Sequence, residues 1–95
     1  MAFFRAQIVR SVAGRDKGKV FCILDTDGPY LLLADGKCRK AARPKRKKAI
    51  HAERAGEFGH PVLEKLLQGK EVTDSEIRRA LAAFRAESKI GRAHV

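Results

Sequence analysis

Segments compatible with short β-strands alternate with turn residues through the first half of the chain. They cover residues 5–12, 19–24, 30–34, 37–41 and 47–52. Several are rich in β-branched, aromatic or aliphatic side chains, which suit a pleated surface. The segment at 30–34 is apolar throughout, so we expect it to be buried on both faces or at a tight position in a barrel. The pattern predicts five strands.

Glycine and proline separate these segments. Gly14–Lys19 contains two glycines and forms a loop between the first two predicted strands. Asp25–Pro29 is a dense turn cluster, and Asp35-Gly36 favours a type I′ hairpin that leads into the segment at 37–41. Five short strands with tight turns in about fifty residues indicate a small β-barrel. Periodicity alone does not determine its strand order.

The second half has the pattern of two amphipathic helices. His60-Pro61 opens the first helix, because proline is tolerated at the first helical position, and Gly69 suits its C-terminal cap. Thr73–Glu76 fits a capping box for the second helix. Apolar residues then follow at helical spacing and predict a helix to about residue 88: Ile77, Ala80, Leu81 and Phe84.

These patterns together predict a fold that is mainly β with C-terminal α. Residues 1–54 form the five-stranded β-barrel. Residues 55–95 form a C-terminal helical appendage of two short helices. We expect the helices to pack on each other or to close one end of the barrel.

The charge of the chain narrows its expected partners. It has 21 Lys and Arg against 11 Asp and Glu, a net charge of +10 and a pI near 10.2. A strongly basic small protein most often binds a polyanion, such as a nucleic acid or an anionic membrane surface. Residues 1–54 hold 14 of the cations and 5 of the acids. We therefore expect the polyanion to meet the first half, and the nearly neutral second half to be structural.

The sequence predicts a cytoplasmic protein. Met1–Phe4 is too short an apolar run for a secretory signal and lacks a cleavage pattern. No run of about 18 apolar residues is present, so no membrane-spanning helix is expected. Cys22 and Cys38 do not form a C-x-x-C pair, and an intracellular protein would keep both reduced.

No catalytic, metal or cofactor site is predicted. Gly14–Lys19 has one residue too few for a phosphate-binding P-loop, and Val20 stands where that motif needs Ser or Thr. His51, His60 and His94 are scattered and do not reach a zinc spacing with the cysteines. The chain offers no nucleophile beside a base and no carboxylate pair with a reason to lie in a cleft. We therefore do not expect an enzyme.

Eight cations and no acid lie in the run Lys37–Lys48. Such density disfavours a folded chain unless a polyanion neutralises it. Three alternatives are a strand edge made basic to prevent edge-to-edge association, a surface for an acidic protein, and a nuclear localisation signal at Pro44–Lys48. Nucleic-acid contact is the preferred interpretation, because Arg and Lys both bind phosphate. The candidate contacts are Arg39, Lys40, Arg43, Lys45, Arg46, Lys47 and Lys48.

The loop between the first two predicted strands contributes a second set of candidates. Arg15, Lys17 and Lys19 put three cations on one short loop, which flanking strands would hold rigid. The alternative is an exposed hairpin whose charges only solvate it. If the run Lys37–Lys48 lies on the same side of the barrel, both segments can meet one nucleic acid. We expect Asp16 to pair locally with a cation and to hold the shape of the loop.

Aromatic residues are few and do not form the base-stacking platform of an RRM domain. We expect Phe21 and Phe84 in the core. Tyr30 is expected to pack at a strand start, with stacking on a base as the alternative. Scarce exposed rings favour recognition of the backbone and shape of structured RNA over sequence-specific binding of single strands.

Residues 9–19 carry a resemblance to a known family. Val9, Val12, Gly14, Lys17, Gly18 and Lys19 match an apolar-x-x-apolar-x-Gly-x-x-Lys-Gly-Lys core. This stretch resembles the KOW motif of ribosomal proteins and NusG-type transcription factors, and the first half is similar to KOW proteins of the large ribosomal subunit. The resemblance implies an SH3-like β-barrel that binds RNA. It also implies RNA contact by Gly14, Lys17, Gly18 and Lys19.

The leading hypothesis is an RNA-binding, ribosome-associated protein. It would dock a basic barrel face and the Gly14–Lys19 loop on structured RNA, above all ribosomal RNA, with ribosomal proteins as further partners. The alternative is a protein-interaction module of the transcription or translation machinery, which could use the stripe Ile77/Leu81/Phe84 if it is exposed. General DNA binding is a third option, because phosphate contacts alone do not distinguish the nucleic acids. Neither a membrane nor a small-molecule substrate is an expected partner.

Overall fold

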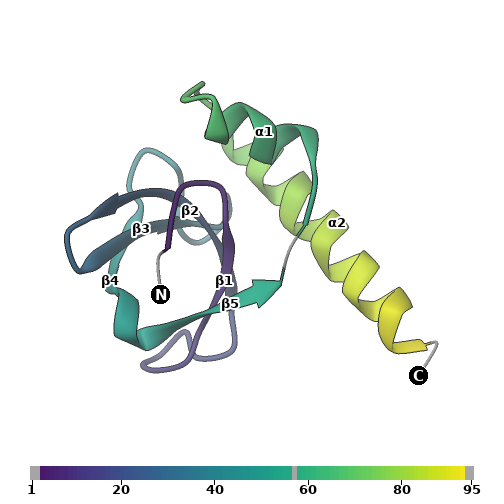
Figure 1. Cartoon of the computed structure of the whole chain (residues 1–95), viewed down its shortest axis with the longest axis horizontal. Helices are drawn as coiled ribbons and strands as arrows, with labels where there is room; N and C mark the ends of the chain where they lie inside the picture. Colours follow the sequence, from purple (N-terminus) through teal and green to yellow (C-terminus); the bar gives the residue numbers. More distant parts are fainter. Residues whose placement is uncertain (1–2, 57, 94–95) are drawn as a thin grey trace.

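Five antiparallel strands are followed by two helices in the computed structural model of the chain (Figure 1). The structure describes residues 3–56 and 58–93, and the side chains among them up to residue 87. The strands form one sheet in the order β4-β3-β2-β1-β5. The elements are β1 (Ile8–Ser11), β2 (Val20–Asp27), β3 (Tyr30–Ala34), β4 (Lys45–Lys48), the 3-10 turn η1 (Ala49–His51), β5 (Ala52–Gly56), α1 (Pro61–Leu67) and α2 (Asp74–Ala93).

The two edge strands of this sheet are neighbours in the sequence. Only the three residues of η1 separate the end of β4 from the start of β5, which lies at the opposite edge. The four Cα–Cα steps from Lys48 to Ala52 span at most about 14 Å, whereas the edges of a flat five-stranded sheet lie roughly 19 Å apart, so the sheet has to curl to bring its edges together. Within the described residues, β4 pairs with β3 and β5 pairs with β1, and these ladders do not close the sheet.

The inner face of the curled sheet encloses a small core. Alternate residues of β1, β2 and β3 point into it, as expected from the two-residue period of a strand. All of them are at most 2% exposed: Val9, Phe21, Ile23, Leu31 and Leu33. Phe3, Ala49 and Ala52 pack against this cluster, so residues preceding β1 and following β4 cover its ends.

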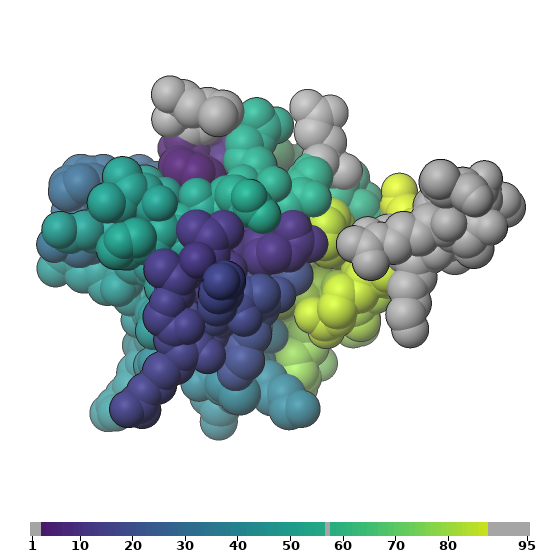
Figure 2. All heavy atoms as spheres, turned by 90° about the horizontal axis from the view of Figure 1, so that it is seen from below, coloured from purple at the N-terminus to yellow at the C-terminus, as the bar shows by residue number. Residues whose placement is uncertain are grey.

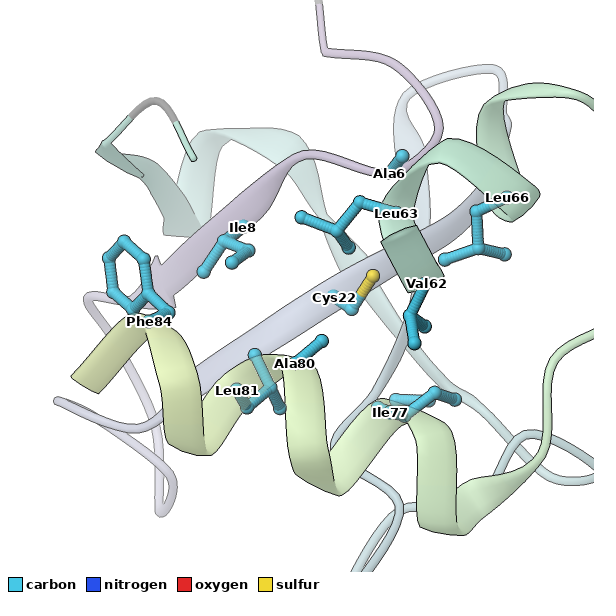
Figure 3. Close-up of a cluster of buried hydrophobic side chains, with 11 residues drawn as sticks. Ala6, Ile8, Cys22, Val62, Leu63, Leu66, Ile77, Ala80, Leu81 and Phe84 are labelled. Carbon is cyan, nitrogen blue, oxygen red and sulfur yellow. The ribbon is translucent and has the colours of Figure 1, made fainter. Parts of the chain in front are cut away.

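The outer face of the sheet forms a second core with the two helices. Ile8 and Cys22 project from β1 and β2 on the side opposite to Val9 and Phe21. Figure 3 shows the apolar side chains of α1 and α2 directed toward them. The helical members are Val62, Leu63, Leu66, Ile77, Ala80, Leu81 and Phe84, all at most 7% exposed. The stripe Ile77/Leu81/Phe84 is thus buried and does not offer a docking face.

α1 begins and ends, and α2 begins, as the local sequence predicts. His60 Nδ1 accepts a hydrogen bond from Val62 N at the start of α1, and Gly69 has a φ of +79° just after its end. Thr73 and Glu76 form the predicted capping box, with reciprocal bonds of 2.9 and 3.1 Å. Lys65 Nζ lies 2.6 Å from Glu76 Oε2 and, with the backbone N–H of Thr73, lowers the pKa of Glu76 to about 2. This ion pair joins the two helices.

The predicted fourth strand at residues 37–41 is wrong. Residues 35–44, which we name the basic loop, are irregular. The Asp35 carboxylate accepts hydrogen bonds from Lys37 N at 2.9 Å and Arg39 N at 2.8 Å. The Arg39 carbonyl accepts from Asp35 N and Gly36 N. These local bonds satisfy groups that a strand would use in its ladder.

Other element boundaries also differ from the prediction. The predicted fifth strand at 47–52 is divided among β4, η1 and β5, and β5 continues two residues past the predicted boundary at 54. β1 starts later than predicted because Ala6, with a φ of +74°, turns the chain before it. β2 is longer, since Asp25 and Asp27 pair with β3 and leave only Gly28-Pro29 as the turn. α2 runs to Ala93 rather than to about residue 88.

Within the described residues, neither helix combines the length and the apolar character needed to cross a bilayer.

Two hydrogen bonds and one close backbone approach fasten the basic loop to the first two turns of α2. Arg78 of α2 donates a hydrogen bond to the carbonyl oxygen of Gly36. Ala41 N donates to Asp74 Oδ1 at 2.7 Å. Gly36 has a φ of +76°, and a Cβ there would clash with the backbone carbonyl oxygen of Asp74. The basic loop thus lies against the helix because residue 36 has no side chain.

We expect Gly36→Ala to lower the free energy of unfolding by more than Gly28→Ala does, as measured by urea denaturation. Both glycines have positive φ, 76° and 58°, so alanine costs about 1–2 kcal/mol at either position. Only at Gly36 must the chain also shift to relieve a clash, because nothing lies within 4 Å of a Cβ at Gly28. Equal losses at both positions would contradict the close approach of the basic loop to α2.

Candidate nucleic-acid interface

The loop between β1 and β2, residues 12–19, has a defined backbone. Gly14 and Gly18 have φ of +84° and +90°, values that residues with a Cβ rarely adopt. Gly18 N donates to the carbonyl oxygen of Ser11 at 2.8 Å, and Ser11 N donates to that of Lys19 at 2.9 Å. Both glycines therefore shape the turn that exposes its three cations, Arg15, Lys17 and Lys19.

The carboxylate of Asp16 points inward from this loop and lies at the centre of a buried polar cluster. Its Oδ2 is 3.3 Å from Lys45 Nζ, and its Oδ1 is 3.4 Å from Lys47 Nζ. The hydroxyl of Ser11 donates to Oδ1 at 3.0 Å, and Lys47 Nζ also donates to the Ala13 carbonyl at 3.1 Å. Ser11, Asp16 and Lys47 are at most 9% exposed. The cluster joins the β1–β2 loop to β4 at the edge of the sheet.

Asp16 thus pairs with a cation, as predicted, but its partners come from β4 rather than from its own loop. Burial by itself raises the pKa of Asp16. Hydrogen bonds from Ser11, Lys45 and Lys47 and the charge of Lys45 outweigh burial, so the pKa lies below its ordinary value of 3.8. One carboxylate faces two ammonium groups, so the cluster retains a net positive charge.

A hollow of about 360 Å³, the first hollow, opens beside this cluster and brings the two predicted basic segments together. It lies between the β1–β2 loop, the basic loop and β4. Five cations and two carboxylates are in its lining, which therefore carries an excess of positive charge. The lining residues are Gly14, Arg15, Asp16, Lys19, Phe21, Asp35, Cys38, Arg39, Lys45 and Lys47.

Six of the twelve predicted contacts line the first hollow, and the other six lie outside it. Lys17 and Gly18 are exposed on the β1–β2 loop, and Lys40 and Arg43 are exposed on the basic loop. Arg46 and Lys48 alternate with Lys45 and Lys47 along β4, so they lie on the opposite face of that strand.

Arg46 has partners away from the hollow. Its guanidinium forms an ion pair with Asp27 at 3.2 Å and lies 4.1 Å from the ring centroid of Tyr30. One face of Tyr30 is therefore covered by a cation, which favours the expected packing role over base stacking. Lys47 is 9% exposed and forms an ion pair with Asp16. Its ammonium group therefore adds positive charge below the surface of the hollow.

A second hollow, of about 530 Å³, continues from the first along α2. Lys19, Asp35 and Cys38 line both. The lining of the second hollow is Gly18, Lys19, Val20, Asp35, Lys37, Cys38, Arg78, Ala82 and Arg85. The two arginines come from the half of the chain that was expected to be structural. Sequence analysis missed them because only the docking of α2 brings them beside the loops; their seven-residue spacing on one helix face was the available signal.

Within the described part of the chain, no three His, Cys, Asp and Glu residues gather in a way that could hold a metal ion. Burial raises the pKa of the Cys22 thiol to about 12, while Cys38 is exposed.

No protein-family model matches this sequence, and the search of curated proteins returned no match either. The resemblance to KOW proteins therefore depends on residues 9–19, and the functional argument depends on the geometry of the two hollows.

We expect Asp16→Asn to lower the free energy of unfolding by about 3 kcal/mol, because loss of one partner leaves buried charge uncompensated. Asp27→Asn is the matched control. It also removes a carboxylate that pairs with a cation of β4, Arg46, but this ion pair is exposed to solvent. Exposed pairs contribute at most about 1 kcal/mol. Chemical denaturation of both variants measures the difference, and similar losses would contradict the structural role of Asp16.

The free energies of unfolding of wild type and Asp16→Asn should depend differently on pH. Because the folded pKa of Asp16 lies below the unfolded value near 3.8, its contribution to stability is fully present above that pH. It is lost as pH falls through the lower, folded pKa. The stability difference between wild type and Asp16→Asn should therefore be constant near neutral pH and shrink below pH 3.8.

Proposed function

We propose that this chain is an RNA-binding protein that docks on structured RNA through the first hollow and the β1–β2 loop. The main support for this proposal is the first hollow, where cations from two separate basic segments lie together and give the lining an excess of positive charge. RNA offers the matching chemistry, a regular array of phosphates.

We further propose that the five strands are an SH3-like barrel of the KOW type. The strand order β4-β3-β2-β1-β5 and the single 3-10 turn between the edge strands support this assignment. So does the position of the KOW-like stretch, residues 9–19, which spans β1 and the β1–β2 loop. This resemblance is also the ground for proposing ribosomal RNA as the RNA and a ribosome-associated, cytoplasmic role.

The proposed mechanism is electrostatic docking with a division of roles. Arg15, Lys17, Lys19 and Arg39 are exposed and contact phosphates directly. Each such contact releases condensed counterions, so affinity falls as salt rises. Asp16 and Lys47 do not need to touch RNA, because their ion pair holds the β1–β2 loop on β4. Loop geometry is thereby set before binding, which lowers the entropic cost of association.

Two features favour recognition of shape over sequence. β1 and β2 are packed on both faces, and the exposed outward side chains of β4 are Arg46 and Lys48, so the described sheet offers no aromatic platform for bases. Arg46 already covers one face of the Tyr30 ring. Phosphate and sugar contacts that depend on RNA geometry fit this surface better than hydrogen bonds to base edges.

The test is the affinity of the protein for a folded fragment of large-subunit ribosomal RNA over a series of salt concentrations. We expect the triple variant Arg15→Gln/Lys17→Gln/Lys19→Gln to lose most of the affinity. Its slope of log affinity against log salt should fall by about 2–3, close to one unit per lost phosphate contact. Its thermal stability should stay near that of wild type, because the three side chains are exposed.

Lys70→Gln is the control, because Lys70 is an exposed cation that follows α1 on a different part of the chain. It should leave affinity and salt slope unchanged. Two competitors separate the alternative partners: polyglutamate stands for an acidic protein, and duplex DNA stands for general DNA binding. Competition by polyglutamate as strong as by the RNA fragment, or salt-insensitive binding, would overturn the proposal.

A further inference from the structure

We infer that α2 is part of the RNA-binding surface, and that one phosphodiester backbone runs from the first hollow across Cys38 into the second hollow. This inference rests on the proposed function and extends its site to the helical half of the chain. The partner is the same RNA. The added contacts are Lys37, Arg78 and Arg85, which sequence analysis did not assign to the site.

The two hollows are adjoining parts of one surface. Lys19, Asp35 and Cys38 line both, so the first hollow borders the second along these residues. Figure 2 shows the β1–β2 loop projecting from this side of the molecule, with blue-teal atoms of the basic loop and yellow-green atoms of α2 next to it. A chain of phosphates that enters between the two loops can therefore continue beside the helix.

The charge of the second hollow also fits a polyanion. Four cations line it against one carboxylate, that of Asp35, and this carboxylate is occupied by two backbone N–H groups. Lys37 and Arg85 are exposed. The cations come from three separate segments of the chain, and their convergence on one depression favours a ligand that carries several negative charges.

The helix presents these arginines at a fixed position. Arg78 and Arg85 are seven residues apart, so they lie on nearly the same side of α2, at the border of its buried stripe. Arg79 is turned about 100° further around the helix, away from the sheet. Arg78 is held by its hydrogen bond to the Gly36 carbonyl. Because the basic loop is fastened to α2, the helix and the loop present their cations as one rigid surface.

Arg85→Gln tests the inference, with Arg79→Gln as the matched control on the same helix. Arg85 is preferred to Arg78, because Arg78 also holds the basic loop in place. We expect Arg85→Gln to weaken binding of the ribosomal RNA fragment about fivefold at 0.1 M salt and to lower the salt slope by about 0.7–0.9, the effect of one phosphate contact. Arg79→Gln should change neither. Thermal stability should be unaffected in both.

Cys38 provides a second, independent measurement on the unmodified chain. It is exposed, whereas Cys22 is 1% exposed, so N-ethylmaleimide should label Cys38 alone in the folded protein. If the RNA backbone crosses residue 38, the labelling rate should fall in step with the fraction of protein bound. Labelling of the saturated complex at the unbound rate would overturn the proposed path.

The outcomes separate this inference from the proposed function. If wild type binds and the Arg15/Lys17/Lys19 variant does not, while Arg85→Gln binds like wild type, the site is confined to the first hollow and the inference is wrong. Equal losses in Arg85→Gln and Arg79→Gln would indicate a non-specific charge effect and would also overturn it. If wild type does not bind the RNA fragment at all, the proposed function fails and the inference with it.

Discussion

The buried carboxylate of Asp16 is the interaction on which the candidate site depends. It lies on a loop between two strands, and its partners, Lys45 and Lys47, lie on the strand at the far edge of the sheet. Without it, two lysines would face each other beside an apolar core, and the β1–β2 loop would lose its attachment to β4. A basic surface needs such an anion, because like charges otherwise push apart the segments that carry them.

The sheet supports this surface by packing on both of its faces. Its inner face encloses a core of its own, and the outer face of β1 and β2 is covered by α1 and α2. The helices therefore have two roles: their apolar stripe completes the outer core, and the first turn of α2 holds the basic loop through Gly36 and Asp74. The position of the basic loop depends on the docking of α2. A change that loosens the helix from the sheet would therefore also change the geometry of the candidate site.

Local signals were sufficient to predict the starts of both helices and the β1–β2 loop. The predicted count of five strands agrees only because the absent strand at 37–41 is offset by the division of 47–52 between β4 and β5. His60-Pro61, Gly69 and the Thr73/Glu76 capping box act within a few residues, so their effect can be recognised in the sequence. The segment at 37–41 was mispredicted because Asp35 and Arg39 bind its backbone locally and because Ala41 N donates to Asp74, 33 positions away. The second hollow was missed because only the docking of α2 brings Arg78 and Arg85 beside the loops. The division of Lys45–Lys48 into inward and outward cations also needed the register of β4 against β3.

β1 and β2 are packed on both faces, so the parts of the sheet half that face solvent are its connecting segments and the outward side chains of β4 and β5. The segments that carry the site can therefore exchange most of their side chains without disturbing either core, since Arg15, Lys17, Lys37 and Arg39 contribute little to packing. Under the proposed function, substitutions at these positions would change affinity for RNA almost independently of folding. Asp16 and Gly36 are among the exceptions, since each combines a structural contact with the position of a loop. A substitution at Asp16 or Gly36 would alter the fold and the proposed binding surface together.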